Sequence, residues 1–387
     1  MSRPILRTEF CERVGIEYPV LLAGMGPVAG TGDPVATADL VAAVSNAGGL
    51  GVLGGVAYSP DELRAQIRKI RSLTDKPFGV DLLLASTFLI PRPSGAMPSM
   101  PAANALPKEQ LEAVQRVADE LDIELKQAPP DLEQMGAWIP EGKSWAGSQM
   151  EVILEEEVPV FASGLGSPGP FADALEANGT TILSLVGNVR AAQQVAGDGA
   201  HYVVAQGTEA GGHTGRIGTL ALLPQVMDAV APKPVIAAGG IASGRALAGV
   251  LAVGAVAAWC GTVFLVSDEA NQPDLQKQRI LDAAAEETVV TRLYSGKTMR
   301  NISNPLIEAW ERQRVSALPM GAQAALIRDL SYSIQKAGRD ELLMNAAGQT
   351  SGMLSRKRPA ADILDEMVAE AAEILASGLG KRVEAAV

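Results

Sequence analysis

One stretch of the sequence, residues 202–215, combines residue types that could carry out proton transfer on a bound planar ligand. It reads Tyr-Val-Val-Ala-Gln-Gly-Thr-Glu-Ala-Gly-Gly-His-Thr-Gly, an apolar run followed by a loop with four glycines and His213, one of only two histidines in the chain. Glycine lets the backbone approach a flat ligand, and histidine is the side chain best matched to proton transfer near neutral pH. We therefore expect a strand at 202–205 and a functional loop after it.

Short apolar runs that alternate with helical patterns must position this loop. Candidate strands lie at residues 20–23, 50–53, 78–84, 158–162, 181–185, 202–205, 235–238 and 257–260. Eight strands alternating with helices predict an α/β fold, a (β/α)8 TIM barrel, in preference to the alternative of an open doubly wound sheet. The length of 387 residues suits such a barrel with an insertion.

The alternation divides the chain into three parts. Residues 1–90 and 141–268 form the expected barrel. Residues 91–140, rich in Pro, Ser, Ala and Met around a helical pattern at 108–125, are either an inserted lid or a surface excursion. Residues 269–387 read as a mostly helical C-terminal cap that contributes to the substrate side, with loops at 293–304 and 345–352 and an amphipathic helix at 360–375.

Two glycine-bearing turns follow the seventh and eighth candidate strands. They are Gly239-Gly240 and Gly261-Thr262. Barrels commonly bind phosphate after these strands, and backbone N–H groups near a helix start suit an anion. Together the turns predict a bound phosphate. The sequence has neither a Gly-x-Gly-x-x-Gly after the first strand nor a P-loop lysine, so a Rossmann or NTPase fold is not indicated.

The composition restricts the classes of partner. There are 32 basic and 44 acidic residues, a balance of −12, which argues against nucleic acid. No apolar run has the length of a membrane span or a signal peptide. The two cysteines lie far apart, as expected for a reducing cytoplasm. We expect a cytoplasmic enzyme that acts on a small-molecule substrate. It could form a homodimer, and no metal site is expected.

Residues 205–215 and 234–241 strongly resemble the nitronate monooxygenase (2-nitropropane dioxygenase) family. These proteins are FMN-dependent barrels related to an FMN-dependent enoyl-acyl-carrier-protein reductase. The resemblance extends over residues 18–55 and 158–265 and continues more loosely at 295–304 and 347–349. The histidine loop is specific to this superfamily but not to one reaction within it.

The resemblance implies a role for each matching residue. It makes His213 the catalytic base facing the flavin. It places Gly24 and Met25 along the isoalloxazine ring. The other residues implied in cofactor binding are Asp81, Gln206, Gly211, Gly212, Gly239, Gly240, Gly261 and Thr262, of which the last four would hold the phosphate. The candidates for contacting an anionic substrate are Lys297, Arg300 and Gln349; the two basic residues could also be simply solvated.

Asp81 departs from the family pattern. The family usually has asparagine at the end of the third strand, where this sequence has an acid. An ionised carboxylate accepts hydrogen bonds but cannot donate them. It would also disfavour negative charge on a flavin, so the substrate or redox preference is expected to differ.

Three other residues have mainly structural interpretations. His201, just before the strand at 202–205, is expected to be a hydrogen-bonded structural histidine. Glu209 is expected to fix its loop by hydrogen bonding. Cys260 is expected to pack in the barrel, since no basic neighbour in the sequence suggests a thiolate.

These observations favour a nitronate monooxygenase-like flavoprotein, an FMN-dependent oxidoreductase that uses O2 to convert alkyl nitronates or nitroalkanes to carbonyl compounds and nitrite. One alternative keeps FMN but acts as an NAD(P)H reductase, or as a dehydrogenase on an enoyl or acyl thioester or a quinone. A more distant alternative is a flavin-free barrel lyase or isomerase with a phosphorylated substrate in the same anion site.

Overall fold

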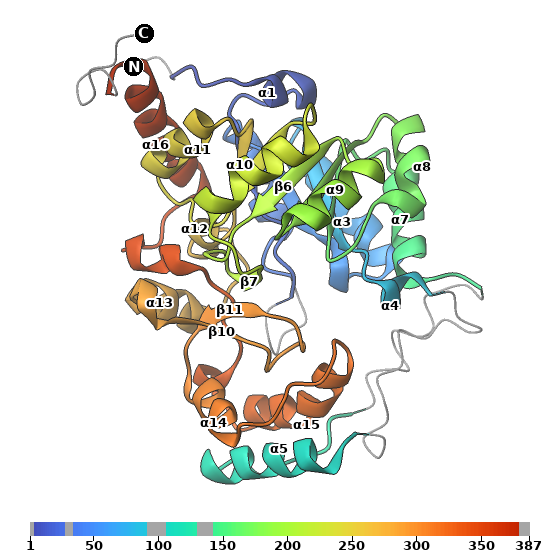
Figure 1. Ribbon diagram of the computed structural model, residues 1–387, viewed down its shortest axis with the longest axis vertical. Helices are drawn as coiled ribbons and strands as arrows, with labels where there is room; N and C mark the ends of the chain where they lie inside the picture. Colours follow the sequence, from blue (N-terminus) through green and yellow to red (C-terminus); the bar gives the residue numbers. More distant parts are fainter. Residues whose placement is uncertain (1–3, 28–33, 91–105, 130–141, 379–387) are drawn as a thin grey trace.

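The eight predicted strands form a closed parallel barrel in the computed structural model (Figure 1). The structure describes residues 4–27, 34–90, 106–129 and 142–378. Around the barrel the strand order is β1-β9-β8-β6-β5-β4-β3-β2, and a bridge from Leu21 to Leu50 joins β1 to β2. The predicted TIM barrel is therefore confirmed. Its strands are β1 Val20–Leu22, β2 Gly51–Gly54, β3 Phe78–Leu83, β4 Val160–Gly164, β5 Thr181–Val186, β6 Tyr202–Gln206, β8 Val235–Ala238 and β9 Ala257–Cys260.

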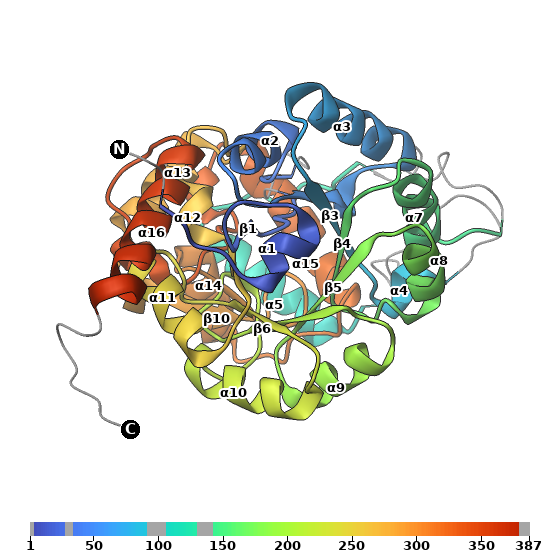
Figure 2. The ribbon, with the colours of Figure 1, turned by 90° about the horizontal axis from the view of Figure 1, so that it is seen from above.

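The strands are mostly apolar because both of their faces are buried. Side chains on the inner face fill the barrel, among them Leu50, Leu183 and Trp259. Helix α1 (Glu9–Val14) lies across the end where the strands begin, as Figure 2 shows. Its Phe10 ring packs edge-on against Tyr202, with centroids 4.9 Å apart. This end is closed by packing, so the opposite end is the one open to a ligand.

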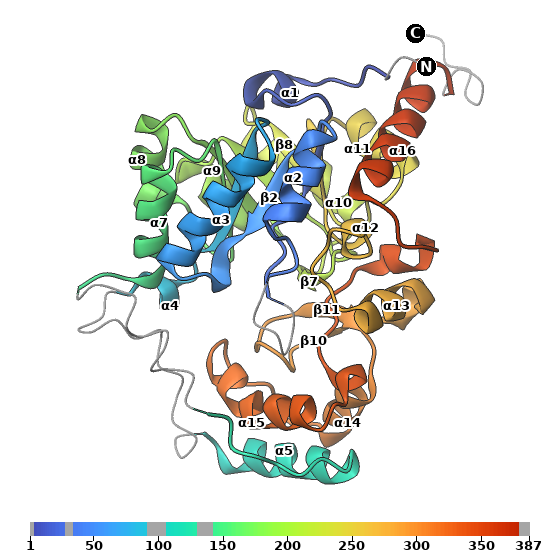
Figure 3. The ribbon, with the colours of Figure 1, turned by 180° about the vertical axis from the view of Figure 1, so that it is seen from behind.

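Helices cover the outer face of the barrel (Figures 2 and 3). The N-terminus of α3 carries a capping box: Ser59 Oγ accepts from the Glu62 N–H, and Glu62 Oε2 accepts from the Ser59 N–H. The last helix, α16, lies against α2 and α11. No helix within the described ranges has the length and apolar character needed to cross a bilayer. The outer helices are α2 Ala38–Asn46, α3 Pro60–Leu73, α7 Trp145–Glu155, α8 Ala172–Ala177, α9 Val189–Gly197, α10 Thr219–Val230, α11 Gly244–Val253 and α16 Ala360–Glu373.

A second hydrophobic core lies below the open end of the barrel in Figure 1. Helix α5 (Lys108–Glu120), from the inserted segment, packs here against α14 (Pro305–Gln313) and α15 (Ala322–Lys336). Residues 91–105 and 130–140 of that segment lie outside the described residues. The predicted helix at 108–125 is confirmed but ends at Glu120. The shorter helices around the open end are α4 Ser86–Leu89, α12 Thr262–Leu265 and α13 Asp274–Asp282.

The prediction of a loop at 293–304 is wrong. This segment contains β11 (Met299–Ile302), which pairs antiparallel with β10 (Thr288–Thr291) on one side and with β7 (Gly212–His213) on the other. Thr214 and Thr298 extend the second pairing: the Thr214 N–H donates to the Thr298 carbonyl at 3.1 Å, and Thr298 Oγ1 donates to the Thr214 carbonyl at 2.7 Å. A three-stranded sheet outside the barrel therefore holds the histidine loop.

Arg300 stabilises this small sheet. Its buried guanidinium donates from Nε to the Thr208 carbonyl at 2.9 Å and from Nη1 to the Thr288 carbonyl at 3.1 Å. Arg300→Met leaves these carbonyls without their donors. We expect the free energy of unfolding, measured by urea denaturation, to fall by about 1–3 kcal/mol.

Arg216 provides a matched control, because it is exposed in the loop that β7 belongs to. Arg216→Met should change the free energy of unfolding by less than about 0.5 kcal/mol. Equal effects of the two substitutions would contradict the structural role of Arg300.

Candidate active site

Two adjoining cavities open at the carboxyl ends of the barrel strands. The larger has a volume of about 500 Å³ and lies between the strand ends and the small sheet that contains β7. The smaller, of about 280 Å³, extends towards the ends of β4 and β5. Asp81, Gln206 and His213 line both cavities and so form part of the wall between them. A cavity of the larger size is ordinary for a cofactor or small-molecule site.

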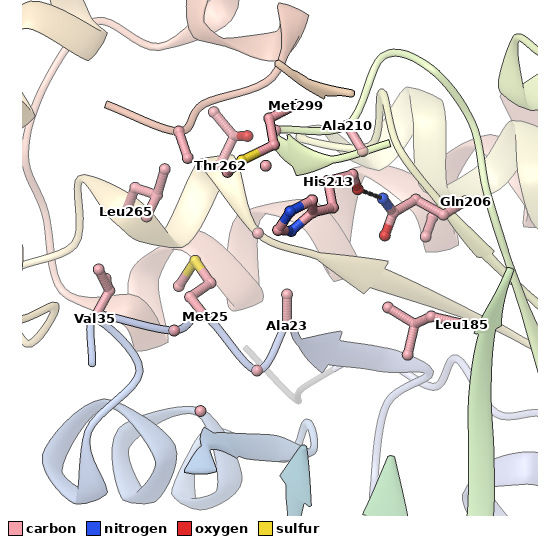
Figure 4. A pocket seen from close by; sticks show the side chains of 18 of the residues that line it. Ala23, Met25, Val35, Leu185, Gln206, Ala210, His213, Thr262, Leu265 and Met299 are labelled. Carbon is pink, nitrogen blue, oxygen red and sulfur yellow. Dashed lines mark hydrogen bonds between the residues drawn. The ribbon is translucent and has the colours of Figure 1, made fainter. Parts of the chain in front are cut away.

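The structure brings most of the sequence-predicted residues together. Lys297 lines the smaller cavity. Figure 4 shows His213 joined to Gln206 by a hydrogen bond, with Met25 on the opposite side of the larger cavity. The predicted residues that line this larger cavity are Gly24, Met25, Asp81, Gln206, Gly211, Gly212, His213, Gly239, Gly240, Gly261 and Thr262.

Two of the expected substrate contacts need correction. Arg300 lines neither cavity, because its guanidinium is turned into the small sheet and bonded to backbone carbonyls there. Gln349 lines neither cavity either; its backbone N–H donates to the Glu209 carbonyl at 3.0 Å, and the next residue, Thr350, is the one that reaches the larger cavity. The Arg300 side chain and the Gln349 backbone therefore both support the histidine loop.

His213 is held at both its backbone and its ring. Its carbonyl accepts from Gln206 Nε2 at 2.5 Å, and its ring Nε2 lies 2.8 Å from Ser295 Oγ. Burial, together with the positive charge of Lys297, lowers the pKa of His213 from 6.5 to about 4. The imidazole is therefore neutral at physiological pH, with one ring nitrogen engaged by Ser295.

Glu209 fixes the histidine loop, as the sequence indicated. Its carboxylate accepts from the Thr219 N–H at 3.0 and 3.1 Å and from Thr219 Oγ1 at 2.9 Å. Thr219 is the first residue of α10, so an acid meets the positive end of a helix. The loop is thus anchored to the barrel at Glu209 and to the small sheet at β7.

The two predicted phosphate turns present free backbone donors. Gly239 and Gly240 have φ of +90° and +76°, a region that favours glycine. Among the described residues, nothing accepts a hydrogen bond from the backbone N–H groups of Gly239, Gly240 or Gly261. Thr262 Oγ1 accepts from the Gly348 N–H at 2.9 Å, which fixes the second turn. Unused N–H groups in a partly enclosed cavity suit an anion.

The two glycines before His213 have different environments. A Cβ on Gly211 would lie 2.6 Å from the carbonyl carbon of Ala347, so this glycine is required by protein packing. A Cβ on Gly212 would meet no atom within 4 Å. Only Gly212 therefore leaves open space beside the histidine, whereas the resemblance implied the same role for both.

Asp81 differs from the ionised carboxylate expected from the sequence. Its Oδ1 is buried, and the described residues provide it with no hydrogen-bond partner. Burial raises the pKa of the Asp81 carboxyl well above its ordinary value. The structure therefore favours the neutral, protonated acid, which can donate a hydrogen bond.

The remaining structural interpretations are confirmed. His201 Nδ1 accepts from the Ile182 N–H at 3.0 Å. Cys260 is buried, and burial raises the pKa of its thiol to about 12, as expected for a packing residue.

Sequence reasoning missed the C-terminal residues that line the larger cavity. Ser295 and Tyr294 come from the turn after β10, and Met299 comes from β11. The only signal in the sequence was the β-branched run at 288–291 followed by a Ser-Gly turn, which is typical of a hairpin. Ser295 is the most important omission, because it contacts the His213 ring.

The neutral state of His213 can be measured by NMR titration of its ring protons. Because burial lowers the pKa, the ring should remain neutral down to about pH 5.5, where an ordinary histidine is mostly protonated. Lys297→Met should raise the titration midpoint, because it removes a repulsive charge. His201→Asn leaves a single histidine signal and so assigns it. A midpoint near 6.5 in the wild-type protein would contradict the structure.

Comparisons with known proteins identify the family. Residues 7–370 match the sequence model of the family described as nitronate monooxygenase. Rv1533 of Mycobacterium tuberculosis, named as a monooxygenase, is 35% identical over 376 residues, which cover 94% of this chain and 96% of that protein. A second relative from the same organism, named (3aS,4S,5R,7aS)-5-hydroxy-7a-methyl-1-oxo-octahydro-1H-indene-4-carboxyl-CoA dehydrogenase, is 35% identical over 308 residues, or 79% of this chain and 69% of that protein.

A solved structure extends the similarity to the whole fold. The nitroalkane oxidase from Streptomyces ansochromogenes superposes with a TM-score of 0.75 at 30% identity, covering 95% of this chain and 99% of that one. The flavin-free lyase or isomerase alternative is thereby overturned, since the relatives are named as oxidoreductases. The chain is an oxidoreductase enzyme that belongs to the nitronate monooxygenase family, whose members are flavin-dependent.

Proposed function

We propose that this protein is an FMN-dependent enzyme that oxidises alkyl nitronates with O2 to carbonyl compounds and nitrite. The observation that carries the proposal is one cavity that joins unused backbone N–H groups to a neutral, hydrogen-bonded His213. The N–H groups suit a phosphate, and the histidine suits a small polar substrate. The names of the family and of the solved neighbour support this substrate class.

The residues of the larger cavity fit FMN. Gly239, Gly240, Gly261 and Thr262 would hold its phosphate through backbone N–H groups and a hydroxyl. Bound FMN would supply the electron acceptor and the reaction with oxygen that ordinary side chains lack. The apolar wall around Met25 would exclude water from the reacting atoms.

His213 would act on the substrate through Nδ1. Ser295 occupies Nε2, whereas Nδ1 has no hydrogen-bond partner within the described part of the chain. Without a proton, Nδ1 can accept the proton from the carbon beside a nitro group. In the other tautomer, with Nε2 accepting from Ser295, Nδ1–H can donate to a nitronate already formed. A pKa of about 4 makes protonation of His213 unfavourable near neutral pH. The preformed nitronate is therefore the better substrate, and the neutral nitroalkane the slower one.

Lys297 would favour an anionic substrate from the smaller cavity. Its side chain is exposed at the edge of this cavity, and its charge acts on the His213 ring. An ammonium near the wall shared with the larger cavity attracts a nitronate more than a neutral nitroalkane. We further propose that the helical unit of α5, α14 and α15 forms part of the cover on the substrate side.

A second candidate function is oxidation or reduction of an acyl thioester. The observation that favours it is the 35% identity to a relative named as a carboxyl-CoA dehydrogenase. The same barrel and flavin site would serve this reaction, with the substrate contacts changed. If the enzyme worked as a reductase, NAD(P)H would reduce the flavin, and the acyl thioester would take the place of oxygen as the electron acceptor.

Replacement of His213 by asparagine tests its role as a base. The amide keeps a hydrogen bond but cannot take a proton near neutral pH, so His213→Asn should lower kcat/KM for a neutral nitroalkane by about 10²–10⁴-fold. Preformed nitronate should be much less affected, because its proton is already gone. Equal losses on both substrates would remove proton abstraction from the mechanism.

Anaerobic mixing distinguishes the two candidate functions. Purified flavin-loaded protein should lose its visible flavin absorption on mixing with an alkyl nitronate and should keep it on mixing with NAD(P)H. The buffer-mixed protein gives the baseline. Rapid loss of flavin absorption on mixing with NAD(P)H would contradict the nitronate proposal and support the second candidate. Loss with an acyl thioester but not with a nitronate would do the same.

A further inference from the structure

Asp81 lies across the barrel mouth from the first glycine turn. Its strand, β3, is four strands from β8 in either direction around the barrel: through β6, β5 and β4, or through β9, β1 and β2. Gly239 and Gly240 follow β8 directly, and Asp81 lies in the second half of β3. A ligand held by its phosphate at β8 and long enough to span the mouth therefore brings its other end to Asp81.

The carboxyl of Asp81 is fixed in the cavity wall. A Cβ placed on Gly24 would lie 2.7 Å from Asp81 Oδ2, so the backbone of the first loop packs directly against the carboxyl. Oδ1 is buried without a hydrogen-bond partner among the described residues. A buried polar atom of this kind is costly unless a ligand pairs with it. Backbone thus covers one side of the carboxyl, and Oδ1 has no partner within the described part of the chain.

Among the described residues, no cation pairs with the Asp81 carboxyl. The titratable groups that line the larger cavity with it are Glu209, His213 and Tyr294, and Lys297 lies at the edge of the smaller one. Glu209 is bonded to Thr219, and His213 is neutral. Burial is the cause of the raised pKa of Asp81, and no charged group in the described part of the chain contributes to it. An uncompensated anion here would be unfavourable.

We propose that Asp81 donates a hydrogen bond, from a protonated carboxyl, to the ring of the bound flavin at the end opposite its phosphate. The inference rests on the proposed FMN site. The ring gains negative charge when it is reduced, and a donor in a buried site stabilises that charge. Asp81 would therefore raise the reduction potential of the bound flavin, whereas an ionised carboxylate in the same place would lower it.

The reduction potential of the bound flavin distinguishes these states. Asp81→Asn keeps a donor of the same shape, so its potential should match the wild type. Asp81→Leu removes the donor, so it should lower the reduction potential of the bound flavin by about 30 mV. For a two-electron couple, this corresponds to an about tenfold lower ratio of reduced to oxidised flavin at a fixed potential. Asp228→Asn, an exposed acid on α10, is the matched control and should change nothing. A potential raised by about 30 mV or more in Asp81→Asn would overturn the proposal, since it would mean that the wild-type acid is ionised.

Infrared spectroscopy tests the protonation without relying on flavin. The flavin-free wild-type protein at pH 7 should show the carbonyl stretch of a protonated carboxylic acid, and the difference spectrum against Asp81→Asn should assign it. Asp228→Asn should retain the band. Absence of the band would overturn the protonated state of Asp81. A protein that shows the band but takes up no flavin would refute the FMN proposal while leaving the protonation of Asp81 established.

Discussion

The antiparallel pairing of β7 with β11 is the constraint on which the site depends. It joins a two-residue strand in the loop after β6 to a segment more than 80 residues later, with His213 opposite Met299 and Gly212 opposite Arg300. The same segment supplies Ser295 to the histidine ring and Arg300 to the Thr208 carbonyl. The barrel alone would leave the loop after β6 without a partner on this side. The C-terminal segment therefore helps to build the candidate site.

Burial without charge compensation is the second physical feature of the cavity. Burial lowers the pKa of His213 and raises the pKa of Asp81. Both shifts favour the neutral form of the side chain. The polar groups left for a ligand are then uncharged donors and acceptors, with Lys297 as the charge at the edge of the smaller cavity. Such a site can bind an anion through N–H groups and respond strongly to charge that develops during a reaction.

The sequence was most informative where local pattern and tertiary structure agree. Apolar runs buried on both faces identified the barrel strands. The loop of His213, with Glu209 as its anchor, was recognisable because glycines and polar residues follow a buried strand. The glycine turns after β8 and β9 were placed correctly at the cavity, since their position follows from strand order alone.

The errors share a different cause, which is dependence on contacts distant in sequence. The strand β11 is too short and too polar to be recognised from sequence before its partner strands are known. For this reason the sequence suggested that Arg300 contacts the substrate, whereas its side chain stabilises the small sheet. Gly211 is a glycine because residue 347 packs on it. The protonation state of Asp81 depends on its burial and on which charged groups the surrounding strands place near it. No single stretch of sequence reveals these neighbours.

Binding of the FMN phosphate by the turns after β8 and β9 is tested most directly by comparing FMN with riboflavin. The two ligands share the ring and differ in the phosphate, so their dissociation constants for the flavin-free protein isolate the phosphate contribution. The account predicts that FMN binds at least about tenfold more tightly than riboflavin and that Gly240→Val removes most of this difference. Equal affinity for the two ligands, or no binding of either, would contradict it.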